Sequence, residues 1–502
     1  MGKFTSALVF LSVLSGLGQL VAALPESSNL RPRRPMLKPR RTKSLLINPA
    51  ALPDLPTADA AAAAAADAGL DLDNIQADIL VGMKKNKELF FFFGISNPAT
   101  FKTKLASSIV PLITTTTEIL SVDTQPVTAV NIAFSQTGLH TLGVNDDLGD
   151  QNFTSGQFSE ATVIGDNPSL WDSAFAGTNI HGVFLLASDT VDNINTELAN
   201  IQTILGSSIT EIHRLQGAAR PGDEQGHEHF GFMDGISQPA VNGFTNPVLP
   251  GQTPGFFLLG ETGDASISKR PAWAKDGSFL VFRQLQQMVP EFNKFLTDNP
   301  LVVPGLTAEE GSELLGSRMV GRWKSGAPIF LTPNADDPVL AADPNRNNDF
   351  NFLIASDPEP GTENHFNQTR CPFGAHIRKV HPRGDLDPSV ENLHFIIRSS
   401  IPYGPEVLAT EAATNTTSAE RGLAFVSYQA DVFNGFPFGK VDPTIGVDPI
   451  IGSLGGGQKV ISGLDQLDPD HDIPIPADYV VSRGGEFFFS PSLAGLDTIA
   501  AA

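Results

Sequence analysis

Four consecutive phenylalanines, Phe90 to Phe93, restrict the fold of this 502-residue chain more than any other segment. Successive side chains of a β-strand point to opposite faces, so a strand with this sequence places two aromatic rings on each face. Charged residues precede the run and Gly94 follows it. Residues 88–95 are therefore predicted to form a strand that is covered on both faces.

Further strands alternate with helices along the rest of the chain. Short apolar segments predict strands at residues 127–134, 182–187, 209–215, 278–282, 394–398, 422–428 and 486–490. Helices are predicted at residues 98–110, 135–142, 191–205 and 290–296, with Ser135 as an N-cap. Because the pattern recurs in two halves, it predicts an α+β protein of two similar domains, residues 61–245 and 246–502.

The N-terminal 60 residues have the composition of targeting and processing sequence. Lys3, an apolar stretch at 7–20 and the small residues 21–23 predict a secretory signal peptide over residues 1–23. A membrane anchor is the alternative, and the shortness of the apolar stretch disfavours it. Residues 24–60 are rich in proline and paired basic residues, which predicts a disordered propeptide and leader. The protein is therefore expected to be secreted and extracellular.

Composition excludes several partners. The formal net charge of −22 repels phosphate backbones and anionic lipids, so neither nucleic acid nor a membrane surface is expected to bind. Cys371 is the one cysteine, so no disulfide can form within the chain. Three Asn-x-Thr sequons, at Asn152, Asn367 and Asn415, are typical of glycosylated surface loops in a secreted protein.

The segment 226–239 concentrates potential catalytic side chains between glycines. It contains His227, Glu228, His229 and Asp234, and the spacing of the two histidines suits a strand rather than the helical motif of zinc proteases. For Asp234 alone, the simplest interpretation is a turn aspartate that bonds to its own backbone. A metal site is a second, less favoured interpretation.

Two later segments add a histidine and an arginine of the same interest. His376 follows small residues and precedes Arg378, which is a pattern that suits a haem-iron ligand with arginines near the propionates. A buried histidine in a basic loop is the alternative. Arg398 ends an apolar strand, and a buried guanidinium needs an anion such as Asp234.

Taken together, these segments resemble the dye-decolourising peroxidases secreted by fungi. Gly231-x-x-Asp234-Gly235 lies inside a longer matching run at 220–239. The other matching segments are residues 75–95, 371–383, 397–406, 422–426 and 447–452. They occur in the family's order over nearly all of the chain that follows the leader. Ala77 departs from the pattern, because family members commonly have glycine there.

The resemblance implies that haem b binds in a cavity between two ferredoxin-like domains. Asp234 and Arg398 correspond to the distal catalytic pair and His376 to the proximal iron ligand, with His227 as a less favoured rival. Asp448 corresponds to the carboxylate that bonds to the proximal histidine. The remaining matches are Leu423 and Phe425 as distal cavity residues, Arg378 at a propionate, and Tyr403 as a surface electron-transfer residue, for which Trp171, Trp273 and Trp323 are weaker candidates.

The function implied by the resemblance is that of a peroxidase. Hydrogen peroxide would oxidise dyes, phenols and other bulky aromatic reductants in one-electron steps, and the enzyme would be a monomer or a homodimer. Two other classes stay open from the residues alone. One is a non-catalytic haem-binding or transport protein on the same fold, and the other is a metal-dependent hydrolase that uses His227, Glu228 and Asp234.

Overall fold

The computed structural model describes most of the chain beyond the leader. The described residues are 61–63, 65, 69–83, 86–121, 125–177, 179–233, 235–241, 251–354, 367–436, 448–452, 459–468 and 470–502. The predicted signal peptide and propeptide lie outside them. Among the residues described, no helix combines the length and the hydropathy that crossing a membrane requires.

All eight predicted strands are present in the nine-stranded main sheet, which has one addition, and two small two-stranded sheets outside it were not predicted. The predicted strands are β1 (Lys87–Ile95), β2 (Thr128–Phe134), β3 (Gly182–Ser188), β4 (Ile209–Ala218), β7 (Ser278–Gln287), β8 (Ile397–Arg398), β10 (Gly422–Gln429) and β13 (Val480–Ser490). The predicted strand at 394–398 is shortened to β8, because residues 392–394 form a 3₁₀ turn. The added strand of the main sheet is β9 (Ile401–Tyr403), which follows β8 after a break at two serines.

The predicted helices are also present. They are α3 (Pro98–Lys104), which continues as a π-helical turn to Ile109, α5 (Gln136–Thr141), α8 (Val191–Leu205) and α9 (Val289–Asp298). Ser135 caps α5 as expected, since its hydroxyl accepts a hydrogen bond from the Gly138 N–H at 3.0 Å. Helix α10 (Ala308–Val320) was not predicted, although Thr307 and Glu310 form a capping box at its start.

Each half of the chain has the strand order of a ferredoxin-like fold. In the first half, the chain order is β1, α3, β2, β3, α8 and β4, and the sheet order is β4-β1-β3-β2. In the second half, β7 is followed by α9, α10, β9, β10 and β13, and the sheet order is β13-β7-β10-β9. The prediction of an α+β protein with two ferredoxin-like units is confirmed. The boundary predicted at residue 245 falls outside the described residues.

The two four-stranded sheets join edge to edge into one closed sheet. The pairing of β2 with β13 joins Phe134 to Phe489, and that of β4 with β9 joins Gly217 to Tyr403. Glycine permits the second contact, because a Cβ atom at Gly217 would lie 2.4 Å from the side chain of Ile401. Closure therefore pairs the outer strands of each unit with those of the other.

The phenylalanines of β1 fill both sides of this barrel wall. Phe92 contacts Phe282 of β7 across the interior, with 4.8 Å between ring centroids, although β1 and β7 are not neighbours in the sheet. Phe91 and Phe93 point outward into a second core beneath α3 and α8. All four rings are buried, as the sequence predicted.

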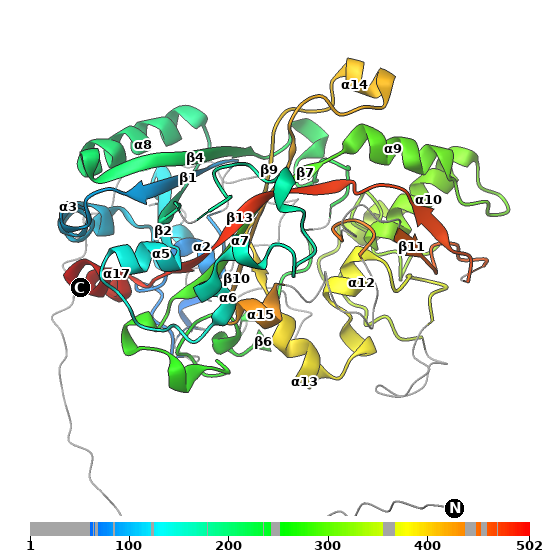
Figure 1. The fold of residues 1–502 in the computed structure, drawn as a ribbon. Coiled ribbons are helices and arrows are strands. Elements are labelled where there is room, and N and C mark those ends of the chain that lie inside the picture. The colour runs from blue at the N-terminus through cyan, green and yellow to red at the C-terminus, as the bar shows by residue number, and fades with distance from the viewer. Residues whose placement is uncertain are drawn as a thin grey trace, which may run out of the picture. The chain divides into compact units, whose positions relative to one another are not determined.

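A third core lies outside the barrel, beneath α9, α10 and the short helix α12 (His376–Val380). In Figure 1, α9 and α10 lie on the opposite side of the strands from α3 and α8. Gly321 ends α10 in the left-handed region at a φ of 99°, and a Cβ atom there would lie 2.3 Å from Ile377 of α12. This glycine therefore allows α12 to pack closely against the end of α10.

Glu486 on β13 is expected to make folding depend on pH. Burial raises the pKa of Glu486 from 4.5 to about 7. Hydrogen bonds from the backbone N–H groups of Gln157 and Phe487 act in the opposite direction but are outweighed. Between pH 4.5 and about 7, the folded state holds a proton that the unfolded state lacks. The free energy of unfolding therefore falls as the pH rises through this range, by up to about 3 kcal/mol. Urea unfolding at pH 4.5 and 7.5 should show this decrease in the wild type and much less of it in Glu486→Gln. An equal decrease in both proteins would contradict the assignment, and exposed Glu313→Gln is the control.

Candidate active site

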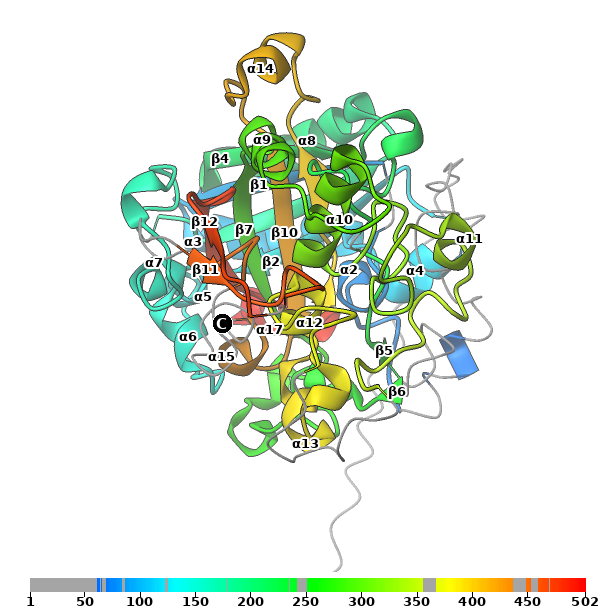
Figure 2. The same ribbon diagram turned by 90° about the vertical axis from the view of Figure 1, so that its right-hand side faces the viewer.

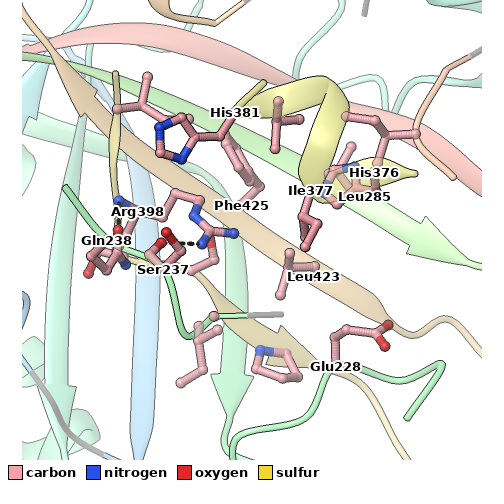
Figure 3. A pocket seen from close by; sticks show the side chains of 18 of the residues that line it. Glu228, Ser237, Gln238, Leu285, His376, Ile377, His381, Arg398, Leu423 and Phe425 are labelled. Atoms are coloured by element: carbon pink, nitrogen blue, oxygen red, sulfur yellow. Dashed lines mark hydrogen bonds between the residues drawn. The ribbon is translucent and has the colours of Figure 1, made fainter. Parts of the chain in front are cut away.

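A large cavity lies between α12, the outer face of β10 and the segments 225–228 and 235–239. Its volume is about 350 Å³, and both halves of the chain contribute to its wall. Figure 2 shows α10 and α12 in front of β7 and β10 in the view toward this side of the barrel. Figure 3 shows Leu423 and Phe425 projecting from β10 between Arg398 and His376.

His376 is fixed by a buried carboxylate. It is the first residue of α12, and its Nδ1 lies 2.7 Å from Oδ2 of the fully buried Asp448. Burial favours the neutral form of Asp448, but the opposing charge of His376, their hydrogen bond and the N–H groups of Ile450 and Ile451 outweigh it, so the pKa of Asp448 lies below 3.8. The carboxylate fixes the ring orientation and selects Nε2 as the nitrogen that would bind a metal.

The apolar wall of the cavity follows from strand alternation. Ala424 and Val426 of β10 point into the barrel, so Leu423 and Phe425 point to its outer side, where both line the cavity. Leu285 of β7, opposite Leu423 in the register, extends the same surface. Two adjacent strands thus present a continuous apolar face to whatever the cavity holds.

Arg398 is hydrogen bonded to the segment that follows Asp234, through both its side chain and its backbone. Its Nη2 donates to the Ser237 carbonyl at 2.8 Å, and its backbone exchanges hydrogen bonds with the Gln238 amide at 3.1 and 2.7 Å. Gly235, Ser237 and Gln238 all line the cavity beside Arg398. Asp234 itself lies outside the described residues, but both of its neighbours are placed, and Gly235 belongs to the cavity wall.

The cavity is cationic in an acidic protein. Among the described residues that line it, five are arginines and two are glutamates; these are Arg220, Arg283, Arg322, Arg383 and Arg398, and Glu88 and Glu228. Arg283 is 1% exposed and pairs through Nη2 with Asp166 and the Ser482 hydroxyl. Within the described part of the chain, its Nε and Nη1 have no hydrogen-bond partner. A buried guanidinium of this kind favours an anionic ligand.

Comparisons with known proteins agree with this site. A family model described as the DyP dimeric alpha+beta barrel domain matches residues 74–221, and one described as Dyp-type peroxidase, C-terminal, matches residues 230–440. The chain is 72% identical to a dye-decolorizing peroxidase of Mycena epipterygia, with all of both chains covered. The fold is also similar to the crystal structure of a fungal DyP-type peroxidase from Auricularia auricula-judae, with a TM-score of 0.81. The two sequences are 49% identical, and the match covers 86% of this chain and 99% of the other.

The chain belongs to the dye-decolorizing peroxidase family. It is therefore an enzyme, a peroxidase, and the two other classes that the sequence left open are set aside. The family depends on haem.

One expected member of the peroxidase site lies elsewhere. Arg378 is 1% exposed and does not line the cavity. Its guanidinium makes two hydrogen bonds of 2.7 Å to Asp385 and stacks over Phe373 at 4.4 Å. Residues two apart on a helix point to nearly opposite sides, so a residue two positions after His376 points away from the cavity. The position of Arg378 does not support a propionate contact.

Arg378 should instead stabilise the fold around α12. Arg378→Met is expected to lower the free energy of unfolding by about 3–5 kcal/mol, because it removes the cation from a fully buried ion pair. Arg346→Met is the matched control, since its ion pair with Asp343 is exposed and should contribute about 0–1 kcal/mol. Denaturant unfolding measures both. Equal unfolding free energies for Arg378→Met and the wild type would contradict this role.

Tyr403 is not a surface residue as expected. It is 3% exposed and belongs to the barrel core, where its hydroxyl donates to Oε1 of Glu420 at 2.8 Å. Of the weaker candidates, Trp171 and Trp323 are also buried, at 7% and 5% exposure, and Trp273 is partly exposed. None of these residues therefore presents a fully exposed aromatic ring to a substrate.

The sequence also missed residues that line the cavity. Val380 lies one turn after His376 on the same face of α12, and this four-residue spacing was the available signal; His381, which follows the last residue of α12, also lines the cavity. Burial lowers the pKa of His381, whose Nε2 lies 3.0 Å from Glu391.

His227, the rival iron ligand, lines the cavity, and its Nε2 is 3.0 Å from the carbonyl of Lys324.

Proposed function

We propose that this chain is a secreted haem peroxidase in which His376 binds the iron of haem b and Asp234 and Arg398 act on hydrogen peroxide. One observation carries the proposal: a histidine held by a buried carboxylate and an arginine line the same cavity. The apolar face of Leu423 and Phe425 suits a porphyrin ring. The arginines of the wall, Arg283 above all, suit its propionates in place of Arg378.

When bound, haem supplies the redox chemistry that takes up the oxidising equivalents of peroxide. Asp234, as a carboxylate of reference pKa about 3.9, accepts a proton from one peroxide oxygen and returns it to the other. Arg398 stabilises the negative charge that develops as the O–O bond breaks. Asp448 accepts the Nδ1–H of His376 and thereby increases the basicity of the ligand.

The reducing substrates are proposed to be dyes, phenols and other bulky aromatic compounds. Leu423 and Phe425 line the cavity near Arg398, and we propose that they let only a peroxide-sized molecule reach that position. Electrons from bulky substrates then reach the cavity through the protein. Tyr403 is our candidate for this transfer, because the preceding residue, Pro402, lines the cavity.

Secretion is supported by the signal-like sequence at 1–23 and by the sequons. Asn415 is exposed at the left-handed C-cap of α14 (Ala409–Thr414), which makes it the best-placed glycosylation site. Asn367 and Asn152 are half-buried. Monomer and homodimer both stay compatible with the site, which one chain contains entirely.

The proposal is tested with protein purified from the culture medium. Oxidation of a bulky dye and of a small phenol should both require hydrogen peroxide and should stop when catalase removes it. Dye oxidation without peroxide, or none with it, would contradict the proposed function.

A further inference from the structure

The three tyrosines of this chain differ in how they can lose a proton. The Tyr403 hydroxyl donates to Glu420 at 2.8 Å, and the Tyr428 hydroxyl donates to Asp78 at 2.8 Å. Tyr479 packs against two phenylalanines of α9. Because a tyrosine gives up its phenolic proton when it is oxidised, a hydrogen-bonded carboxylate decides which ring can act as an electron carrier.

The two carboxylates differ in their access to solvent. The side chain of Glu420 is 41% exposed, whereas Asp78 is 1% exposed inside the protein. A proton received by Glu420 can pass to water and return, whereas a proton received by Asp78 stays in the core. Tyr403 also directly follows Pro402 of the cavity wall, and its hydroxyl bonds to the partly exposed Glu420.

The surroundings of the Tyr403 phenol and of Glu420 also bear on the loss of the phenolic proton. Burial, together with the charge of Glu420, raises the pKa of Tyr403 well above its ordinary value, so the ring does not ionise before it is oxidised. The Gln284 side chain acts in the opposite direction on the pKa of the phenol, and its Oε1 lies 3.3 Å from Nε2 of His213. Nε of the partly exposed Arg483 lies 3.7 Å from Oε1 of Glu420.

We propose that Glu420 is the proton acceptor for the one-electron oxidation of Tyr403. The inference rests on the proposed function, because peroxide supplies the oxidising equivalent held in the cavity. In the forward step, the ring would give one electron to the cofactor that peroxide has oxidised, the phenolic O–H bond breaks and an O–H bond forms on Glu420. An aromatic reductant outside returns one electron, and Glu420 returns the proton.

The test follows the tyrosyl radical rather than turnover alone. Holoenzyme is mixed with one equivalent of hydrogen peroxide, freeze-quenched and examined by electron paramagnetic resonance. Glu420→Gln keeps the shape and a hydrogen-bond acceptor but is not a base, so the radical should form about 10²–10⁴-fold more slowly. Glu420→Asp should restore much of the rate. Glu211→Gln, which changes another exposed carboxylate paired with an arginine, is the matched control and should match the wild type.

The variants separate this inference from the proposed function. Tyr403→Phe should remove the radical and Tyr428→Phe should not. Radical loss in Tyr403→Phe together with wild-type formation in Glu420→Gln would overturn the role of Glu420 alone. An unchanged radical in Tyr403→Phe would overturn the use of Tyr403 and with it this inference. If peroxide changes neither the haem spectrum nor the radical signal of the wild type, the proposed function itself fails.

Discussion

Asp234→Asn is expected to react with hydrogen peroxide about 10²–10⁴-fold more slowly than the wild type, because asparagine cannot accept the peroxide proton. The substitution keeps the size and polarity of the side chain, so haem content and fold should be unchanged. Stopped-flow absorbance of the haem bands after mixing with peroxide measures the rate. A rate close to that of the wild type would show that Asp234 is not the proton acceptor.

Glu228→Gln is the control for this variant. Glu228 also lines the cavity, but its oxygens accept hydrogen bonds from the Phe230 and Phe232 N–H groups at 2.8 Å, which gives it a role in holding the loop. It should slow the peroxide reaction far less than Asp234→Asn does. A larger effect in Glu228→Gln would transfer the proton role to that residue.

His376→Ala is expected to lose most of the bound haem. His381 also lines the cavity, but its partner Glu391 is 12% exposed and bonds to Nε2, whereas the partner of His376, Asp448, is fully buried and bonds to Nδ1, which selects Nε2 to bind a metal. The ratio of haem to protein absorbance measures the loss. Imidazole added to the variant should restore part of the haem binding, because it replaces the missing ligand in the space left by the side chain.

His227→Ala separates the two candidate ligands. Its Nε2 is already close to the Lys324 carbonyl, and no carboxylate is bonded to its ring among the described residues. This variant should keep its haem. Haem loss in His227→Ala with full retention in His376→Ala would reverse the assignment.

The fold could be predicted where local patterns were strong. The phenylalanine run located β1, and α8 has the predicted bounds at both ends. β9 was missed because three residues with a central proline carry too little pattern, and its pairing with β4 and β10 alone makes it a strand. Closure of the two sheets is also a long-range property that no segment encodes by itself.

The types of residue in the candidate site could be predicted from the sequence, but the directions in which their side chains point were harder to predict. His376 is far in sequence from Leu423 and Phe425, and the structure brings all three to one cavity, with the distant Asp448 buried against His376. Arg378 was misplaced because the orientation of α12 points it toward Asp385. Tyr403 belongs to the barrel core, whereas the preceding residue lines the cavity; this alternation needs the register of β9 to be known.

The visible absorption spectrum of the purified protein, recorded before and after one equivalent of hydrogen peroxide, tests the central claim most directly. The account predicts haem bands in the resting protein, a rapid change of those bands with peroxide, and their return when an aromatic reductant is added. A protein without haem absorbance, or one whose haem bands do not respond to peroxide, would contradict it.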